Sequence, residues 1–268
     1  GSETLKSDWL PNLAGGTQRI AVALNERAGR YRWQVCETHA NNDRLTGHKH
    51  VVLGGADANA YLVSAMHNGQ LALYLVANGA AGLRAEPYAT QDGGRAVDLY
   101  LKDTPAILVT ADGLTAGAAA EAMGIAWLCA EGVGIMERML AITVDYMNTR
   151  QQFGKTIASF QALRHRVADV KMALELARSM SYYATLKLNA VPEERDQAMA
   201  RAKVQLGQSM RLVGQACIQL HGGIGVTDEV AISHYFKRLT QMEMQCGDTL
   251  HHLGRVSDQM QATAGVFA

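Results

Sequence analysis

One short interruption in an otherwise helical half of the chain constrains the fold more than any other feature. Apolar residues recur every three or four positions over about 116–148 and again over about 160–189, and the stretch 149–161 separates these two segments. This spacing predicts two amphipathic helices, each with one apolar face to bury. The stretch between them must therefore turn the chain so that both faces reach a common core.

The interruption combines residue types that suit a ligand as well as a turn. Arg150 carries a forked, permanently charged donor that matches phosphate, while Phe153 and Phe160 offer flat apolar rings. Gly154 can adopt a positive φ angle. Ser159 is placed to cap the second helix, as in an ordinary turn between helices. A ligand-binding loop and a structural turn both stay open on this segment alone.

The remainder of the C-terminal half also reads as helix. Two further helices are predicted over about 192–220 and 229–262, and Pro192 with the two acidic residues after it favours a helix start. Four helices of this length predict an antiparallel bundle over residues 113–268. The twelve methionines, several of them on these helices, are interpreted as adaptable core residues.

The chain before the bundle has a different character. Residues 18–112 consist of short β-prone runs separated by Gly, Asn and Asp, and the pair Asn68-Gly69 predicts a hairpin. No helical pattern intervenes to make a parallel sheet, so we expect a small antiparallel β domain and an α+β fold overall. The predicted strands lie at about 19–24, 51–53, 60–65, 71–77 and 96–101.

Composition excludes several functional classes. The 25 basic residues balance 25 acidic ones, which argues against a nucleic-acid binder, and no basic amphipathic segment suggests a membrane surface. We find no apolar run of transmembrane length and no signal peptide, so the chain is expected to be cytoplasmic. The four cysteines lie far apart and form no C-x-x-C pair, so we expect reduced, packed thiols.

A second conspicuous loop contains Gln219, Leu220, Gly222 and Gly223. A dinucleotide fingerprint would have to follow a strand, whereas this stretch follows a predicted helix, so the Rossmann interpretation fails. The alternatives are a glycine-rich helix end that approaches a flat or anionic ligand and a simple glycine cap.

The histidine pair His251-His252, beside Glu243 and Asp248, does not predict a metal site. Adjacent helical residues point about 100° apart and cannot easily face one ion. No H-E-x-x-H motif is present either.

Taken together, these stretches resemble the acyl-CoA dehydrogenase family. The resemblance is carried by C-A-E-G-V-G-I-M-E-R at 129–138, R-Q-Q-F-G-K-T-I-A-S-F-Q-A-L at 150–163 and Q-L-H-G-G-I-G-V-T-D-E at 219–229, which resemble the C-terminal helical domain. The L-T-G-H-K stretch at 45–49 stands where the middle β domain of the family has a strand and turn.

Other stretches resemble one branch of that family, the small subunits of pimeloyl-CoA-dehydrogenase-like two-subunit enzymes. They are Y-A-T-Q-D-G-G-R at 88–95 and C-G-D-T-L-H-H-L at 246–253. The W-L-P-N-L-A-G-G stretch at 9–16 resembles the segment that enters the middle domain. Residues 1–17 are therefore expected to be a remnant of the N-terminal helical region, with the β domain at 18–112 and the bundle at 113–268.

The resemblance implies FAD as cofactor and an acyl-CoA thioester as substrate. Such an enzyme removes an α-proton with a carboxylate base while the β-hydride goes to the flavin. In this family the R-x-x-F-G loop reaches across a subunit interface, which would give Arg150 the cofactor pyrophosphate, and the Q-x-x-G-G loop would lie against the adenosine end. The implied FAD contacts are Arg150, Gln152, Phe153, Phe160, Gln161, Gln219, Leu220, Gly222 and Gly223.

The chain departs from the family where the chemistry should lie. The usual position of the base falls on Cys246, and the alternative position falls near Gly124, so neither offers a carboxylate. Leu53 stands where the β domain normally provides a hydroxyl to the flavin. Glu243 and Asp248 are the weak candidates for a base elsewhere in the chain.

These observations predict a flavoprotein subunit that pairs with a larger, base-bearing subunit and completes the FAD site of that partner. Electron-transfer flavoprotein is the implied electron acceptor, and no nucleic-acid or membrane partner is expected. Two alternatives stay open: a self-sufficient homo-oligomeric dehydrogenase, and a structural pseudo-subunit that binds no flavin.

Overall fold

The computed structural model describes the backbone of residues 1–264 and the side chains of residues 1–260. The chain forms two compact units, the first from Gly1 to Ala120 and the second from Glu121 onward. The long helix α2 (Gly113–Thr149) belongs to both units, because the division between them falls within its first turns.

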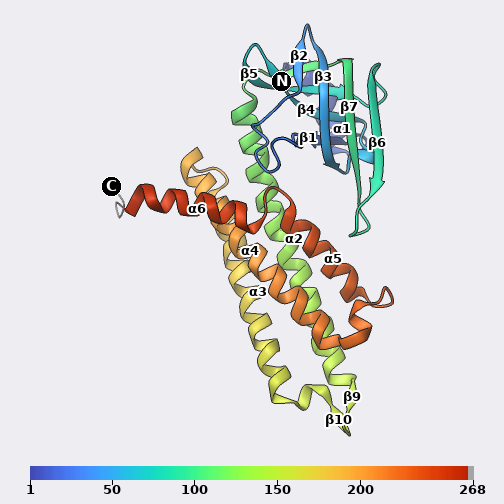
Figure 1. Ribbon diagram of the computed structural model, residues 1–268, viewed down its shortest axis with the longest axis vertical. Coiled ribbons are helices and arrows are strands. Elements are labelled where there is room, and N and C mark those ends of the chain that lie inside the picture. The colour runs from blue at the N-terminus through green and yellow to red at the C-terminus, as the bar shows by residue number, and fades with distance from the viewer. Residues whose placement is uncertain (265–268) are drawn as a thin grey trace. The chain divides into compact units, whose positions relative to one another are not determined.

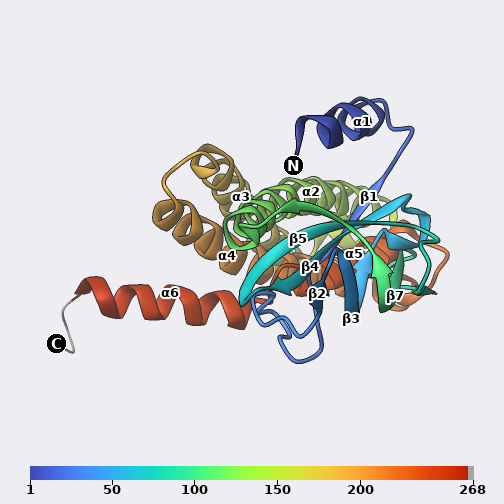
Figure 2. The same ribbon diagram turned by 90° about the horizontal axis from the view of Figure 1, so that it is seen from above.

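Within residues 1–120, an eight-stranded sheet forms the first unit, in the order β6-β7-β3-β2-β4-β5-β8 with β1 paired to β4 (Figures 1 and 2). Most neighbours are antiparallel; β1 and the short β2 run parallel to β4. The α+β prediction is confirmed. The elements are α1 (Glu3–Ala14), β1 (Ile20–Ala23), β2 (His39–Asn41), β3 (Arg44–Leu53), η1 (Gly55–Asp57), β4 (Ala60–His67), β5 (Gln70–Ala77), β6 (Leu83–Ala89), β7 (Arg95–Pro105) and β8 (Ile107–Thr110).

The hairpin between β4 and β5 has the predicted turn. Asn68 and Gly69 both adopt left-handed backbone angles, with φ of 51° and 80°, the combination that a two-residue type I′ turn needs. Sequence reasoning missed β6, which is an edge strand of mostly exposed residues containing Pro87. Proline is tolerated at an edge because its missing N–H breaks no ladder hydrogen bond there.

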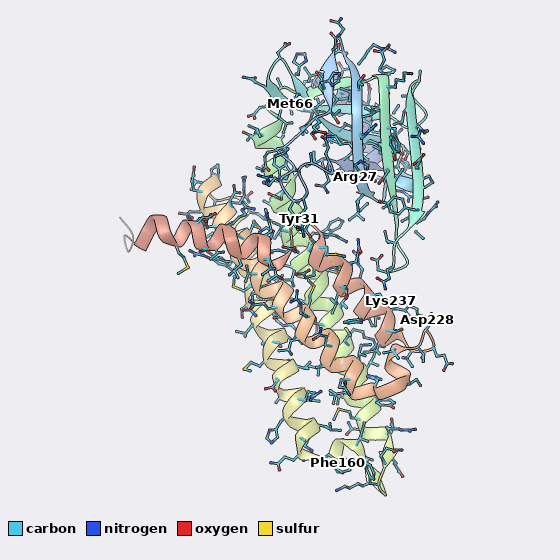
Figure 3. The ribbon with its side chains drawn as sticks, viewed as in Figure 1. Arg27, Tyr31, Met66, Phe160, Asp228 and Lys237 are labelled. Atoms are coloured by element: carbon cyan, nitrogen blue, oxygen red, sulfur yellow. The ribbon has the colours of Figure 1, made fainter. Side chains whose placement is uncertain are left out.

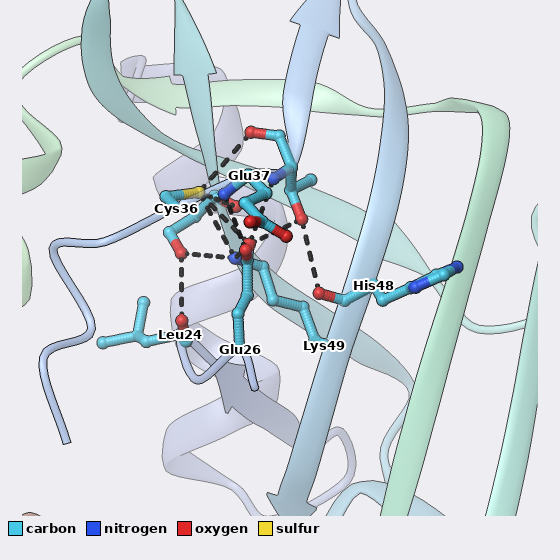
Figure 4. A network of polar contacts seen from close by, with 8 residues as sticks. Leu24, Glu26, Cys36, Glu37, His48 and Lys49 are labelled. Carbon is cyan, nitrogen blue, oxygen red and sulfur yellow. Dashed lines mark hydrogen bonds and ion pairs between the residues drawn. The ribbon is translucent and has the colours of Figure 1, made fainter. Parts of the chain in front are cut away.

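A buried ion pair joins the loop after β1 to the sheet (Figure 4). The Glu26 carboxylate accepts hydrogen bonds from Lys49 Nζ at 2.6 Å and Thr38 Oγ1 at 2.7 Å, and Lys49 also donates to Ser64 Oγ at 2.8 Å. Burial pushes the pKa of Glu26 upward. The hydrogen bond and the charge of Lys49, with further donors, outweigh that effect and lower the pKa to about 2. The charges are paired and hydrogen-bonded, as burial requires.

The second unit is the expected antiparallel bundle, in which α2, α3, α4 and α5 lie alongside one another (Figure 1). Buried methionines fill much of its core, as predicted; they are Met136, Met139, Met199, Met210 and Met242. After α2 come β9 (Gln151–Gln152), β10 (Lys155–Thr156), η2 (Ile157–Ser159), α3 (Gln161–Lys187), α4 (Pro192–His221), η3 (Gly222–Val226), α5 (Ala231–Met244) and α6 (Thr249–Ala264).

The single helix predicted over 229–262 is wrong, because two helices, α5 and α6, occupy that range. Cys246 and Gly247 have φ of 53° and 92°, which a right-handed helix cannot include. The chain therefore changes direction at the break, and α6 leaves the bundle at a steep angle to α4 (Figure 2). In the part of the chain that the structure describes, no helix has the length and apolar character needed to cross a membrane.

Candidate functional site

The stretch after α2 is a small β-hairpin rather than a simple turn. Strands β9 and β10 pair through Gln152 and Lys155, and the two residues between them, Phe153 and Gly154, have φ of 54° and 77°. These angles match a type I′ turn, in which glycine is favoured and phenylalanine is rare. The sequence prediction of a positive φ at Gly154 is confirmed. A phenylalanine held in the left-handed region at a hairpin tip is a strained arrangement of the kind that collects at functional sites.

The interpretation of Ser159 as the N-cap of the second helix is wrong. Its hydroxyl donates to Thr156 O at 2.7 Å inside the 3₁₀ turn η2. The residue that precedes α3 is Phe160, which makes no side-chain capping hydrogen bond. The hydrogen bond of Ser159 therefore stabilises the base of the hairpin instead of the helix.

The hairpin presents its ligand-suited side chains to solvent. Phe153 is 89% exposed, and its ring meets the edge of Phe160 at 6.1 Å between centroids. Lys155 Nζ lies 4.5 Å from the centroid of Phe160, which adds a cation–π contact. The Arg150 side chain is exposed and has no hydrogen bond or ion pair with any residue that the structure describes. The guanidinium is therefore available to an external anion.

Two other predicted cofactor contacts, Gln152 and Gln161, differ from Arg150 in their surroundings. Gln152 donates its side-chain amide to Gln151 O at 2.9 Å, so its amide is engaged within the hairpin. Gln161 is exposed at the first position of α3.

The second predicted loop begins where α4 ends. Gly222 closes the helix with φ 66°, and a side chain added at Gly222 or Gly223 would meet nothing within 4 Å. Their backbone is therefore open to solvent and to a ligand. Gly225 differs, because a Cβ there would lie 2.7 Å from Ile218 O. Gly225 is thus required by packing, and Gly222 by its backbone angle.

The structure brings the two loops together at one end of the bundle. Met147 at the end of α2, Ile157 below the hairpin and Leu220 at the end of α4 form one buried cluster. The Tyr146 ring stacks on His221 at 4.5 Å, and its hydroxyl donates to His221 O at 3.3 Å. Figure 3 labels Phe160, which lies at this end of the bundle. Leu220, predicted as a cofactor contact, is 6% exposed and lies inside the cluster, so its side chain holds the loops together.

This end of the bundle fits FAD on the chemistry of its residues. An unpaired, exposed guanidinium suits a pyrophosphate, the exposed Phe153 and the half-buried Phe160 suit a flat ring system, and open glycine backbone allows close approach. Arg150, Phe153, Gly222 and Gly223 would hold the cofactor.

Gly124 and Cys246, the two positions where the resemblance places the base, face each other in this chain. A Cβ added to Gly124 on α2 would lie 3.3 Å from the Cys246 sulfur at the break between α5 and α6. Burial, with a smaller contribution from the charge of Glu121, raises the pKa of Cys246 to about 11. The side chain is therefore a neutral thiol near neutral pH and is not a general base there.

Glu243 and Asp248 are both engaged at the start of α6. Glu243 Oε1 accepts from Thr249 N at 3.0 Å and Thr249 Oγ1 at 2.6 Å, and Asp248 Oδ1 accepts from His251 N at 2.7 Å. These are capping interactions, which satisfy the free N–H groups of a helix start. The geometry thus explains both carboxylates without a catalytic role.

Sequence reasoning missed Glu121, the carboxylate whose charge acts on Cys246. It lies on α2 one helical turn before Gly124, and Arg255 on α6 approaches it at 3.8 Å. The signal available in the sequence was its spacing, because residues three apart share a helix face.

Lys203 stabilises the break between α5 and α6 through hydrogen bonds to backbone carbonyls. Its fully buried ammonium donates to Met242 O at 3.2 Å, Glu243 O at 2.8 Å and Gly247 O at 2.9 Å. His252, also fully buried, makes a 2.7 Å hydrogen bond from Nε2 to Cys246 O, and burial lowers its pKa to about 3. The carbonyls freed where the helix stops are therefore satisfied, and Cys246 is held in a fixed position.

In the first unit, Leu53 occupies the position where the resemblance expects a flavin-facing hydroxyl, and its side chain is 37% exposed. Val22 and Val51, in the segments that the resemblance places against the flavin, are 48% and 47% exposed. Val51 adopts φ 52°, which is unusual for a β-branched residue, and its N–H donates to Asp98 Oδ1 at 3.0 Å. These side chains offer apolar contact but no hydrogen bond.

The fold and the match to a known family identify a flavin-dependent oxidoreductase. Residues 115–260 match the family described as acyl-CoA dehydrogenase, C-terminal domain, and the chain belongs to the acyl-CoA dehydrogenase family. The predicted enzyme class and the predicted cofactor, FAD, are confirmed at the level of this family.

Individual proteins agree with this assignment. The chain is 28% identical over 278 residues to the acyl-CoA dehydrogenase FadE27 of Mycobacterium tuberculosis, covering 98% of this chain and 72% of that protein. It matches the solved Tcur3481-Tcur3483 steroid ACAD with a TM-score of 0.86 at 29% identity, over 99% of this chain and 73% of the other. A solved structure described as the electron transferring flavoprotein of Acidaminococcus fermentans matches with a TM-score of 0.89 at 25% identity, over 97% and 73% of the two chains.

Proposed function

We propose that this chain is one subunit of a two-subunit, FAD-dependent acyl-CoA dehydrogenase and completes the FAD site of a larger, base-bearing partner. One observation carries the proposal. The chain has exposed loops whose residues suit the cofactor, whereas the two positions expected for the base are occupied by Gly124 and by the neutral thiol of Cys246, which lie close together. The name of the solved Tcur3481-Tcur3483 enzyme, which joins two components, supports a paired arrangement.

The reaction is the α,β-desaturation of an acyl-CoA thioester. FAD, when bound, supplies the acceptor for the β-hydride. In this proposal Arg150 binds phosphate oxygens of the cofactor and Phe153 packs on the cofactor. The glycine loop lets the cofactor approach the backbone closely. The α-proton goes to a carboxylate of the partner, because a thiol with a pKa of about 11 does not accept it. Electron-transfer flavoprotein is the proposed electron acceptor, and the likeness to the Acidaminococcus fermentans structure supports this choice.

Arg150 also argues against a purely structural pseudo-subunit. A scaffold without flavin gains nothing from an exposed guanidinium that contacts no described residue. The self-sufficient dehydrogenase is less well supported, because Glu243 and Asp248 both cap α6. Exposed apolar side chains on the bundle helices, among them Trp127 on α2 and Leu186 on α3, further predict an oligomer. A monodisperse monomer by light scattering at micromolar concentration would count against association.

The substitution Arg150→Ala tests the cofactor role. It removes charge-assisted hydrogen bonds to the pyrophosphate, each about 1.5–3 kcal/mol, so FAD should dissociate about tenfold or more faster from the complex. Arg201→Ala is the matched control, since Arg201 is an exposed arginine on α4. Flavin absorbance after gel filtration is the measurement, with melting temperature beside it. Unchanged flavin occupancy with a large drop in melting temperature would make Arg150 a structural residue.

A further inference from the structure

The buried network around Glu26 holds a cysteine and a lysine in direct contact, and nothing described so far gives this pair a role (Figure 4). Lys49 Nζ donates to Cys36 Sγ at 3.5 Å. The side chain of Lys49 is fully buried, whereas Cys36 is only half-buried, which leaves a small oxidant a route to it. The pair therefore combines a thiol that solvent can approach with an amine that is held beneath it.

One carboxylate lies within hydrogen-bond distance of both members of the pair. Glu26 Oε1 accepts from Lys49 Nζ at 2.6 Å and from Cys36 Sγ at 3.3 Å. The thiol has a single proton, and its other acceptors, Thr38 O at 3.4 Å and Ser64 O at 3.5 Å, compete for it. Glu26 can therefore take up a proton from either the thiol or the ammonium.

This contact distinguishes Cys36 from the other cysteines. The charge of Lys203 acts on Cys129 and Cys246, but its ammonium donates to backbone carbonyls at the break between α5 and α6. Over the side chains of residues 1–260, only Lys49 donates a hydrogen bond to a cysteine sulfur. Cys246 and Lys203 thus form a natural comparison, a cysteine near a buried lysine without the contact.

We propose that Cys36 and Lys49 form an oxidative cross-linking site, at which hydrogen peroxide converts their contact into a covalent S–N bond. In the first step, peroxide oxidises the Cys36 thiol to a sulfenic acid and is itself reduced to water. In the second step, Lys49 Nζ gives one proton to Glu26 and attacks the sulfur, so that the S–N bond forms and the S–O bond breaks. The departing hydroxide takes the second proton from the nitrogen and leaves as water, and the product is a sulfenamide.

The first step is slow and the second is favoured by position. Burial raises the pKa of the Cys36 thiol, although the charge of Lys49 opposes this effect, so little thiolate is present to react with peroxide. Once the sulfenic acid forms, the amine already lies beside the sulfur, and a reaction between groups held in contact outpaces a reaction with a second peroxide molecule. The bond would tie the loop after β1 to strand β3 and remove the charge of Lys49.

Peptide mass spectrometry of the full chain tests the site. The folded chain is treated with hydrogen peroxide, the remaining thiols are alkylated in denaturant, and the protein is digested with trypsin. The peptides that contain Cys36 and Lys49 should appear as one species, about 2 Da lighter than their sum, because two hydrogens are lost. Trypsin should no longer cleave after Lys49, and dithiothreitol should restore both the separate peptides and the cleavage.

Cys36→Ser keeps a hydrogen-bond donor at this position and should abolish the linked species. Cys246 is the internal control, and it should form no bond to Lys203 in the same sample. Because the wild-type chain carries both the test and this control, the result does not depend on the folding of a variant.

Three results would overturn the proposal. The first is Cys36 recovered as free thiol or sulfinic acid with no link to Lys49. The second is a link between Cys246 and Lys203 at the same yield. The third is a linked species about 14 Da heavier than the sum of the peptides, which would contain an oxygen between sulfur and nitrogen.

Discussion

Replacing Lys203 with methionine should destabilise the second unit strongly. The buried ammonium donates three hydrogen bonds, at 3.2, 2.8 and 2.9 Å, to carbonyls around the break between α5 and α6. Methionine has a similar length and no donor, so the Glu243 and Gly247 carbonyls lose this partner, whereas Met242 O still accepts from Gln245 N. Each unsatisfied group costs about 1–3 kcal/mol. Relief from burying a charge offsets part of this sum, so the expected loss is about 2–4 kcal/mol of unfolding free energy.

The assay is urea unfolding of both variants, followed by circular dichroism. Lys171→Met is the control, because Lys171 is 58% exposed in a helical ion pair with Glu175. That substitution should change the unfolding free energy by no more than about 0.5 kcal/mol. If Lys203→Met also lies within about 1 kcal/mol of wild type, the carbonyls are satisfied without the ammonium, and the reasoning about this break is wrong.

Three other perturbations follow from the structure. The pKa of Glu26 is about 2 in the folded chain and 4.5 ordinarily. Ionised Glu26 therefore contributes fully to the free energy of unfolding above pH 4.5, and this contribution is lost as the pH falls toward 2. The contribution is about 3 kcal/mol. Urea unfolding measured at pH values across this range should show the loss, and an unfolding free energy that does not change with pH would contradict it. Cys246→Glu places a carboxylate at the empty base position and should give the FAD-loaded chain a trace of acyl-CoA turnover that Cys246→Gln lacks; equal activities would contradict the alignment of this position. Glu243→Gln should lower the unfolding free energy by about 1–2 kcal/mol through the weakened cap at Thr249, whereas lost turnover at unchanged stability would indicate a catalytic role.

The sequence was most informative where one local signal determines the structure. The Asn68-Gly69 turn, the helical periodicity of the bundle and the positive φ of Gly154 follow from residue type and spacing. Strand β6 was missed because edge strands carry weak patterns and tolerate proline. The break before α6 was missed although Gly247 marks it, because apolar spacing continues on both sides.

The candidate site shows the same limit. Arg150 and the glycine loop could be identified from residue chemistry and the family resemblance. The capping role of Glu243 and the hydrogen bond from Ser159 to Thr156 O could not, because each depends on a contact set by the three-dimensional fold. The close approach of Gly124 and Cys246 could not be predicted either, because these residues lie far apart in the sequence.

In the proposed function, this chain completes a cofactor site but does not supply the base. The most direct measurement is acyl-CoA dehydrogenation with an external electron acceptor, by the FAD-supplemented chain alone, by its larger partner alone and by the complex. Straight-chain and steroid acyl-CoA thioesters should both be offered. We expect turnover by the complex and none by this chain alone. Robust turnover by the purified, partner-free chain would contradict it.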